Sequence, residues 1–386
     1  MRIVDVCAFY TPKGGGVRTY VERKLEAAPA AGHEIVVVAP GRTDGTERRG
    51  PHARIEWVES PRFPLDRRYG YFSDAARLHR LLDRLQPDLV EVSSPWRSAS
   101  MVADWQGDAR RVLLMHADPL SAYAYRWFGR VAERDTIDRS FGWYWRHLRR
   151  LDHRFDAVVS ASDALSRRLR DGGLTRVHTN PMGVEPGLFS PTLRDESLRA
   201  RLLERCALPP NATLLLGVGR HAPEKRWPMV VDAAMAAANH RPVGLLLVGE
   251  GRTTAKIKAR IGDNPHIRLL SPIRDRLTLA RTFASADALI HGCEAETFCI
   301  AAAEARASGL ALIAPDEGGA ADQARASGGF TYPAGSALGA AQAIHRFVDA
   351  GRPRGDGVVR TMDEHFADLF DLYRWLERPA VAAVAA

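Results

Sequence analysis

Short apolar runs alternate with amphipathic stretches along the first half of the chain. The apolar runs occupy positions 3–8, 35–39, 89–92, 112–115 and 157–160, and a helical pattern lies at 73–85. Near-continuous apolar runs are typical of strands buried on both faces, as in parallel sheets covered by helices. The first half is therefore predicted to be an α/β domain with a parallel sheet.

The same alternation continues in the second half. Apolar runs lie at 213–219, 243–248, 286–291 and 310–314. After the first of these, helical spacing places Trp227, Val230, Val231, Ala234 and Ala238 on one face. A last helix is predicted at 361–376, after a segment punctuated by proline and glycine. The second half is predicted to be another parallel α/β domain.

The length of the chain indicates two hydrophobic cores. A chain of 386 residues, of which 46% are hydrophobic, exceeds what one core usually supports. The boundary is placed in the proline-containing, arginine-rich segment 186–211. We therefore expect a first domain at 1–185, a linker at 186–211 and a second domain at 212–350.

Two carboxylates, Glu296 and Glu304, are the most informative polar positions. They follow the apolar run 286–291, and Thr297 is the predicted N-cap of the helix between them. Their spacing places one acid in a loop and the other about two turns inside the helix, so both face a ligand that lies across the helix start. A bound anion is indicated. The alternative is one solvated acid and one acid on a helix face.

Two cations follow the run 213–219. Arg220 and Lys225 lie on a loop at the carboxyl end of a predicted strand, where an arginine fork and a lysine charge suit a diphosphate. The alternative for Arg220 is a surface ion pair with Glu224, and such pairs contribute little to stability.

The same loop also fits a weak dinucleotide-binding pattern, Gly217-x-Gly219-x-x-Ala222, which resembles that of an NAD-binding Rossmann unit. Pro223 and the two cations occupy its turn, and the acid after the next strand, Glu250, lies well beyond the usual spacing of about 20 residues. A dehydrogenase is therefore disfavoured.

Charge and cysteine content exclude several classes. The net charge is +8, but the bias is spread over the chain, without zinc-finger spacing, an RNP-like sequence or a helix-turn-helix element, so nucleic acid is not an expected partner. The four cysteines show no paired spacing, which indicates neither a zinc site nor a disulfide framework. Asp5 interrupts the first apolar run, and no apolar run approaches 18 residues. A cytoplasmic protein is expected.

Arginine and aromatic residues are interleaved at 123–150. Such a mixture can seat a protein on anionic lipid headgroups, which would make the protein peripheral to the inner face of the cell membrane. The equal alternative is a pair of helices that pack their rings inward.

The order of the motifs resembles that of the retaining, nucleotide-sugar-dependent glycosyltransferases of family four, which have two facing Rossmann-like domains, the GT-B fold. The matching segments are the glycine loop at 11–20, the strand ending at His116, the segment 180–191, Arg220 with Lys225, the segment 246–251, and Glu296 with Glu304. The resemblance extends along nearly the whole chain. It implies that a terminal helix at about 361–378 crosses back to the first domain.

The resemblance implies transfer of a hexose from a nucleotide diphosphate sugar to a hydroxyl of a lipid, lipid-linked or saccharide acceptor, with retention of anomeric configuration. Fixed cations and amides would stabilise the leaving diphosphate. No suitable Asp-x-Asp pair occurs, so no metal is expected. The implied catalytic residues are Glu296, His116, Arg220 and Lys225, and the implied donor-binding residues are Gly14, Gly15, Gly16, Arg220, Lys225, Pro272, Ile273, Glu296, Thr297, Phe298, Cys299, Ile300 and Glu304.

This chain departs from the family pattern around the acidic motif. Where the family usually has Glu-Pro-Phe-Gly, the chain has Glu296-Thr-Phe-Cys299, and the family's preceding Pro-Ser is His291-Gly292. The family's Asn-Gly-Val-Asp is Met182-Gly-Val-Glu185. These changes concern the identity of the donor sugar, for which a UDP-sugar is favoured and a GDP-sugar remains open. A sugar-nucleotide epimerase of the same fold and a non-catalytic nucleotide-sugar-binding protein are the alternatives.

Overall fold

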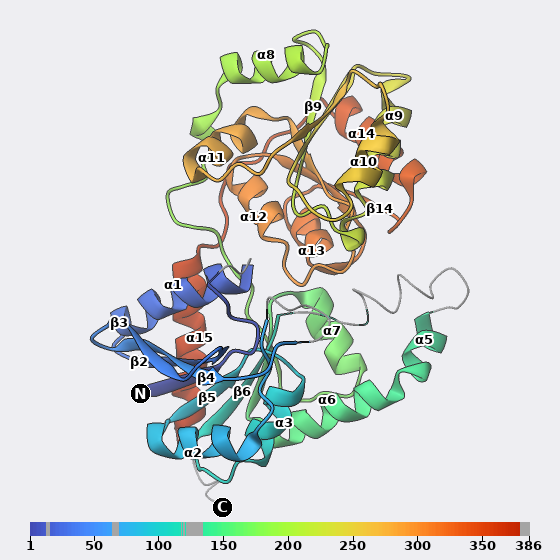
Figure 1. Cartoon of the computed structure of the whole chain (residues 1–386). Helices are drawn as coiled ribbons and strands as arrows, with labels where there is room; N and C mark the ends of the chain where they lie inside the picture. The colour runs from blue at the N-terminus through green and yellow to red at the C-terminus, as the bar shows by residue number, and fades with distance from the viewer. Residues whose placement is uncertain (13–15, 64–68, 117, 119, 121–133, 379–386) are drawn as a thin grey trace, which may run out of the picture.

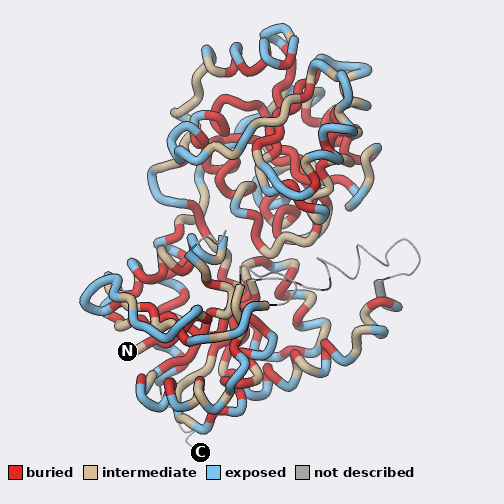
Figure 2. Tube along the Cα trace, viewed as in Figure 1, coloured by how far each residue is buried: buried red, intermediate tan, exposed pale blue. Residues whose placement is uncertain are grey.

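The computed structural model describes residues 1–12, 16–63, 69–116, 118, 120 and 134–378, and the structural statements that follow refer to these residues. In Figure 1 they form two α/β domains, one above the other. Buried residues gather at the centre of each domain, and exposed residues lie at its periphery (Figure 2).

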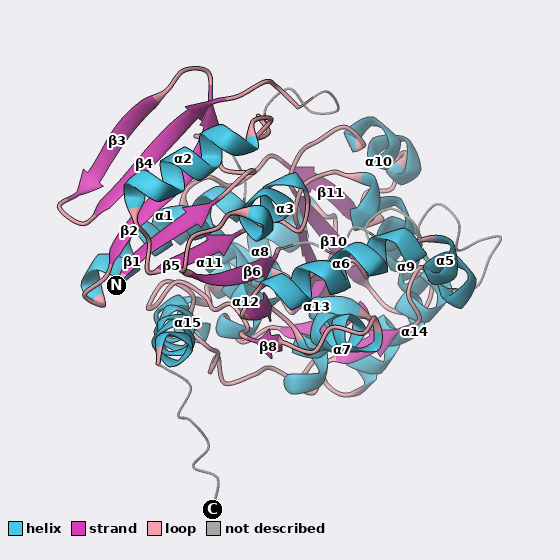
Figure 3. Cartoon of the chain, turned by 90° about the horizontal axis from the view of Figure 1, so that it is seen from below, coloured by secondary structure: helices cyan, strands magenta, loops and turns pink. Residues whose placement is uncertain are grey.

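The first domain is built on an eight-stranded sheet with the order β3-β4-β2-β1-β5-β6-β7-β8. All neighbouring strands are parallel except β3 and β4. Figure 3 shows this sheet extending from β3 and β4 at one edge, with the helix α15 beside it. The strands are β1 (Arg2–Val6), β2 (Glu34–Gly41), β3 (Gly45–Gly50), β4 (Ala53–Glu59), β5 (Leu89–Val92), β6 (Arg110–Met115), β7 (Ala157–Ser160) and β8 (Val177–Thr179).

Helices cover both faces of this sheet, because alternate residues of each strand point to opposite sides. Val36 and Val38 pack with the helices of one face, and Ile35 and Val37 pack with those of the other. One face carries α2 (Ala75–Leu85), α3 (Arg97–Asp104), α5 (Arg134–Ser140), α6 (Gly142–Arg154) and α7 (Asp163–Asp171), and the other carries α1 (Gly16–Ala30) and α15 (Met362–Glu377).

The second domain has a six-stranded sheet, all parallel, with the order β11-β10-β9-β12-β13-β14. Its strands are β9 (Thr213–Val218), β10 (Val243–Val248), β11 (Ile267–Leu270), β12 (Ala288–Ile290), β13 (Ala311–Pro315) and β14 (Phe330–Tyr332). One face carries α8 (Glu196–Arg205), α11 (Arg276–Ser285), α12 (Ile300–Ala307) and α13 (Gly318–Ala326). The other carries α9 (Trp227–Ala238), α10 (Thr254–Ile261) and α14 (Ala337–Asp349), and two 3₁₀ turns, η2 (Pro191–Leu193) and η3 (Pro223–Lys225), complete the domain.

Two features of this architecture differ from the sequence expectations. The antiparallel pair β3–β4 was not predicted, because β3 at the edge of the sheet is exposed and polar along most of its length. The expected linker 186–211 contains α8, whose Arg199 forms two hydrogen bonds with Asp287, at 3.0 and 2.8 Å. Leu202 and Leu203 are buried in the second core. This segment therefore packs as part of the second domain.

The chain crosses between the domains twice, and the two crossings lie side by side. Val184 and Thr361 form a parallel bridge, in which Val184 N–H donates to the carbonyl of Arg360 at 3.0 Å. A Cβ atom at Gly183 would collide with the backbone of Thr361, so this close approach requires glycine. Thr361 then caps α15, which returns to the first domain as expected. The predicted terminal helix and fold class are confirmed.

A buried charge cluster ties α1, β1 and β5 to α15. Lys24 is fully buried, with its Nζ 3.2 Å from Asp5 Oδ2 and in contact with Glu91. Tyr373 of α15 donates a hydrogen bond to Glu91. Burial alone would lower the pKa of Lys24, but Asp5 and Glu91 raise it above its ordinary value, so the ammonium stays charged. The cluster therefore adds a polar contact to the apolar packing that holds α15 on the first domain.

Among the helices of the described ranges, none is both long enough and apolar enough to cross a lipid bilayer.

Replacement of the buried lysine tests this cluster. Lys24→Met leaves two carboxylates buried without their cation, and it is expected to lower the free energy of unfolding by at least about 3 kcal/mol. The shift of the urea midpoint measures the change. Lys256→Met on the exposed face of α10 is the matched control, expected to stay within about 0.5 kcal/mol. Equal midpoints for the two variants would contradict the role of the cluster.

Candidate functional site

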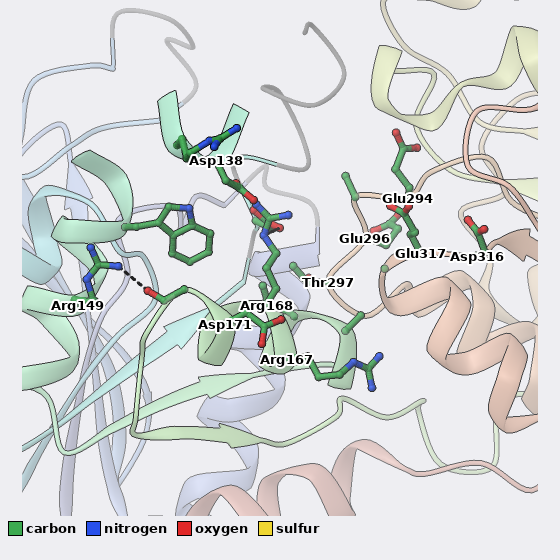
Figure 4. Close-up of a pocket in the computed structure, with 18 of the residues that line it drawn as sticks. Asp138, Arg149, Arg167, Arg168, Asp171, Glu294, Glu296, Thr297, Asp316 and Glu317 are labelled. Carbon is green, nitrogen blue, oxygen red and sulfur yellow. Dashed lines mark hydrogen bonds and ion pairs between the residues drawn. The ribbon is translucent and has the colours of Figure 1, made fainter. Parts of the chain in front are cut away.

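A cleft of about 740 Å³ lies between the two domains and is lined mainly by charged residues. Figure 4 shows arginines of the first domain on one side and acidic residues of the second domain on the other. The lining residues are Asp118, Asp138, Arg139, Gly142, Trp145, Arg149, Ala164, Leu165, Arg167, Arg168, Asp171, Gly172, Glu294, Ala295, Glu296, Thr297, Asp316, Glu317, Gly318 and Arg325.

The loop after β12 brings two of the predicted residues into direct contact. Lys225 Nζ donates to Glu296 Oε1, and both side chains are largely enclosed, at 14% and 22% exposure. His291 Nε2 lies 3.3 Å from the same carboxylate oxygen. Burial, with the nearby Lys225 charge, holds the pKa of His291 well below its ordinary value. Glu296 therefore lies between an ammonium group and a neutral imidazole.

A second ion pair fixes the turn that presents Lys225. Arg226 follows η3 in the left-handed conformation, with φ +51°, which is unfavourable by about 1–2 kcal/mol for a residue other than glycine. Its guanidinium donates to both carboxylate oxygens of Glu294, which is 8% exposed. The sequence alone did not predict this pair. The sequence signal for it is that two adjacent cations follow one strand, while two acids, Glu294 and Glu296, follow another strand of the same sheet.

The helix after Glu296 begins differently from the expectation. Thr297 is not its N-cap; the N-cap is Cys299, in the left-handed conformation with φ +69° and without a side-chain cap. Gln323 donates to the carbonyls of Phe298 and Cys299 at 2.7 and 2.9 Å. Ile300, the first residue of α12, is partly exposed. This tertiary support lets a left-handed cysteine occupy the position at which the family has glycine.

Thr297 instead joins the two domains. Its Oγ1 donates to the backbone carbonyl of His116 at 3.1 Å. The His116 ring lies edge-on to Tyr20, with 5.0 Å between ring centroids, and its Nε2 is enclosed without a hydrogen-bond partner. Burial, aided by Lys24 and opposed by Asp5, lowers the pKa of His116 to about 4. The imidazole is therefore neutral at physiological pH.

Glu304 lies farther along α12 and is also paired. Its carboxylate is 8% exposed and accepts from Arg276 Nη2 at 3.0 Å. Burial raises the pKa of Glu304, and Arg276 opposes that rise. Pro272 and Ile273 lie in the loop between β11 and α11, both half-buried. Because this loop leaves the carboxyl end of β11, it lies at the same edge of the sheet as the loop after β12.

The remaining predicted residues are not brought to Glu296 by described contacts. Arg220 is 72% exposed and lies 3.4 Å from Glu224, the surface ion pair considered as its alternative. Gly16 is the first residue of α1. Gly14 and Gly15 lie outside the described residues.

Comparisons with known proteins identify the family. The model of Glycosyltransferase Family 4 matches residues 14–188, and that of Glycosyl transferases group 1 matches residues 212–350. A GDP-mannose-dependent alpha-mannosyltransferase of Mycobacterium tuberculosis (strain CDC 1551 / Oshkosh) is 31% identical over 339 residues, which cover 83% of this chain and 81% of that protein.

Two further proteins are similar. A GDP-mannose-dependent alpha-(1-6)-phosphatidylinositol dimannoside mannosyltransferase of Mycobacterium tuberculosis (strain ATCC 25177 / H37Ra) is 28% identical over 81% of this chain and 79% of its own. The solved structure of sucrose-phosphate synthase from Thermosynechococcus elongatus aligns with a TM-score of 0.74 at 20% identity, covering 97% of this chain and 98% of that chain.

The chain therefore belongs to glycosyltransferase family 4 and has the GT-B fold. It is a glycosyltransferase, and the similar proteins named above are mannosyltransferases that depend on GDP-mannose. The predicted family, fold and enzyme class, a hexosyltransferase, are confirmed.

Proposed function

We propose that this protein is a retaining mannosyltransferase that moves mannose from GDP-mannose to a hydroxyl of a lipid-linked or saccharide acceptor. The observation that carries the proposal is the contact of Lys225 with Glu296 beside Thr297, which bonds to His116 of the opposite domain. Residues from three parts of the chain are thus linked by these contacts, and two of them, Glu296 and Thr297, line the interdomain cleft.

The arrangement suits departure of a diphosphate. Charge develops on the leaving phosphate as its bond to the anomeric carbon breaks, and a cation held in place beforehand stabilises that charge without reorganisation. Lys225 supplies this cation, and the amides at the start of α12 supply further donors. Glu296 then accepts hydrogen bonds from the sugar, while the neutral His116 contacts the sugar from the first domain.

Glu304 would hold the ribose diol of the nucleotide. In the structure its carboxylate is occupied by Arg276. Arg276 is partly exposed and also lies 3.6 Å from Glu185, so it has a second carboxylate available when Glu304 binds the ribose. The loop at 272–273 lies at the same edge of the sheet and would contact the base through its backbone.

The proposed donor differs from the one that the sequence alone favoured. Motif order did not separate uridine from guanosine donors, and a UDP-sugar was preferred. Four similar proteins, matched over 81–83% of this chain, are named as GDP-mannose-dependent. Three similar solved structures, of Anabaena Alr3699/HepE with UDP or UDP-glucose, are 16–17% identical, so they support the fold and not the nucleotide.

Nucleotide choice is tested by thermal unfolding. GDP-mannose and GDP are expected to raise the unfolding temperature, because a ligand at about 100 times its Kd stabilises the native state by about 2.7 kcal/mol. UDP-glucose and UDP at equal concentrations are the controls and are expected to give smaller shifts. Larger shifts with the uridine nucleotides would overturn the assignment of the donor.

The roles of Lys225 and Glu296 are tested by transfer kinetics. Lys225→Met and Glu296→Gln are each expected to lower kcat/KM by at least about 10²-fold, since each removes a preorganised interaction with the departing or transferred group. Lys256→Met removes an exposed lysine on α10 and is expected to transfer at the parental rate. Parental kcat/KM in either site variant would refute its assigned role.

A membrane-associated acceptor is supported by the outer face of α6. Tyr144 and Trp145 are buried, as expected if the helices of segment 123–150 pack their rings inward. Trp143, by contrast, is 51% exposed. Arg146 and Arg150 are exposed on the same helix. The neighbouring Trp96 is 36% exposed and its ring lies 5.6 Å from that of Tyr144. Residues 121–133 of the predicted stretch lie outside the described residues.

We propose that this patch, Trp96, Trp143, Arg146 and Arg150, seats the enzyme on the anionic inner face of the cell membrane. A double variant, Trp143→Ala with Arg146→Glu, is expected to bind phosphatidylglycerol vesicles less than the parent in a sedimentation assay. Arg241→Glu, an exposed charge reversal on the second domain, is the control. If the parent binds neutral and anionic vesicles equally, and if salt does not change the bound fraction, the proposal is contradicted.

A further inference from the structure

Two of the chain's departures from its family meet at one place in the fold. His291 directly follows β12, and Cys299 precedes α12, eight positions later. The loop between them folds back so that both side chains lie beside Glu296. One potential ligand atom from each residue lies within 4.8 Å of those from the other two.

The histidine of this trio has unsatisfied bonding capacity. His291 is 2% exposed, and neither Nδ1 nor Nε2 has a hydrogen-bond partner. A buried polar group without a partner is unfavourable, and native proteins rarely contain one without a reason. Its Nε2 faces Glu296 Oε1 at 3.3 Å. Nε2 therefore lies near the Glu296 carboxylate without a hydrogen bond to it, and its bonding capacity is unused.

The donor set selects a class of ion. Imidazole nitrogen, carboxylate oxygen and thiolate sulfur together are typical ligands of zinc, whereas magnesium and calcium prefer oxygen alone. Zinc–ligand bonds of about 2.0–2.3 Å in a tetrahedron place neighbouring ligand atoms about 3.3–3.8 Å apart. The distance from His291 Nε2 to Glu296 Oε1 already fits that spacing.

We propose that His291, Glu296 and Cys299 bind a divalent transition metal of the zinc class, with water as the fourth ligand. Binding transfers the thiol proton of Cys299 to solvent and leaves a thiolate on the metal. The carboxylate that now contacts Lys225 becomes a ligand, and the ammonium turns away from the dication. This site stands independently of the assigned donor.

One consequence rests on the proposed function. A metal on Glu296 occupies the carboxylate that would accept hydrogen bonds from the sugar, and it displaces Lys225 from its place beside the leaving phosphate. Zinc is therefore an inhibitor that competes with the nucleotide sugar, and magnesium, which prefers oxygen ligands, leaves transfer unchanged.

Cobalt(II) is the probe for the metal site. Titration of the purified full chain without donor is expected to produce the thiolate-to-cobalt absorption band with one ion per chain, and zinc is expected to abolish that band. His291→Ser and Cys299→Ser are each expected to weaken cobalt binding by at least about tenfold. Loss of a group that only hydrogen-bonds to a metal ligand weakens metal binding by about 10- to 100-fold, and loss of a ligand itself is expected to weaken it at least as much. His291→Asn and Cys299→Gly are second variants if either serine variant unfolds.

Other buried cysteines supply the controls. Cys206 is a buried cysteine at the end of α8, where its carbonyl contacts His266. The variant Cys206→Ser is expected to retain the cobalt band. Cys293→Ser removes the buried thiol next to the site and is also expected to retain it. Absence of the cobalt band in the parent would overturn the proposed site. So would a band that Cys293→Ser loses and Cys299→Ser keeps.

Transfer assays with and without zinc test the consequence separately. Zinc is expected to raise the apparent KM of the parent for GDP-mannose. It is expected to leave the KM of His291→Ser unchanged, when the KM of each protein is measured with and without zinc. Metal binding without any change in KM would refute the inhibition while the site stands. Absence of transfer from GDP-mannose would refute the proposed donor and leave the cobalt result unaffected.

Discussion

The second-domain side of the interdomain cleft depends on two ion pairs between a turn and a loop. Lys225 and Arg226 are adjacent, Glu294 and Glu296 are two residues apart, and each cation contacts one acid. Largely enclosed charges are tolerated only when they are paired, so removal of either partner leaves a costly charge. The pairing fixes the loop after β12, and this loop in turn carries Thr297 to His116 of the other domain.

The relation of the two domains depends on the return of the chain. The crossings at Val184 and Thr361 form backbone hydrogen bonds with each other, and α15 buries its aromatic face against the first sheet. Tyr373 of that helix reaches the buried cluster of Lys24, Asp5 and Glu91. Tyr20, one turn before Lys24 on α1, lies with its ring near the Lys24 ammonium on one side and edge-on to His116 on the other. The C-terminal helix and the cleft are thus joined through packed side chains.

The departures from the family pattern have a structural meaning. A left-handed backbone favours glycine, yet Cys299 adopts it with its carbonyl bonded by Gln323 and its side chain buried. A buried thiol therefore lies at a backbone position that favours glycine. His291 adds an imidazole beside the same glutamate. The site keeps its ammonium–carboxylate pair and gains nitrogen and sulfur donors, a chemical character that the fold alone does not impose.

The sequence by itself determined the two parallel sheets and the returning helix after Thr361, because apolar periodicity and capping residues are local signals. It also singled out Glu296 and Lys225, whose roles stay a prediction. It did not predict the β3–β4 edge, whose polar residues look like a loop, or the true start of α12 at Cys299, which depends on contacts from α13. Only the tertiary structure decided that Arg226 pairs with Glu294, that segment 186–211 belongs to the second domain, and that His291 and Cys299 converge. The physical reason is that such contacts join residues distant in sequence, and their energy depends on burial that no local pattern encodes.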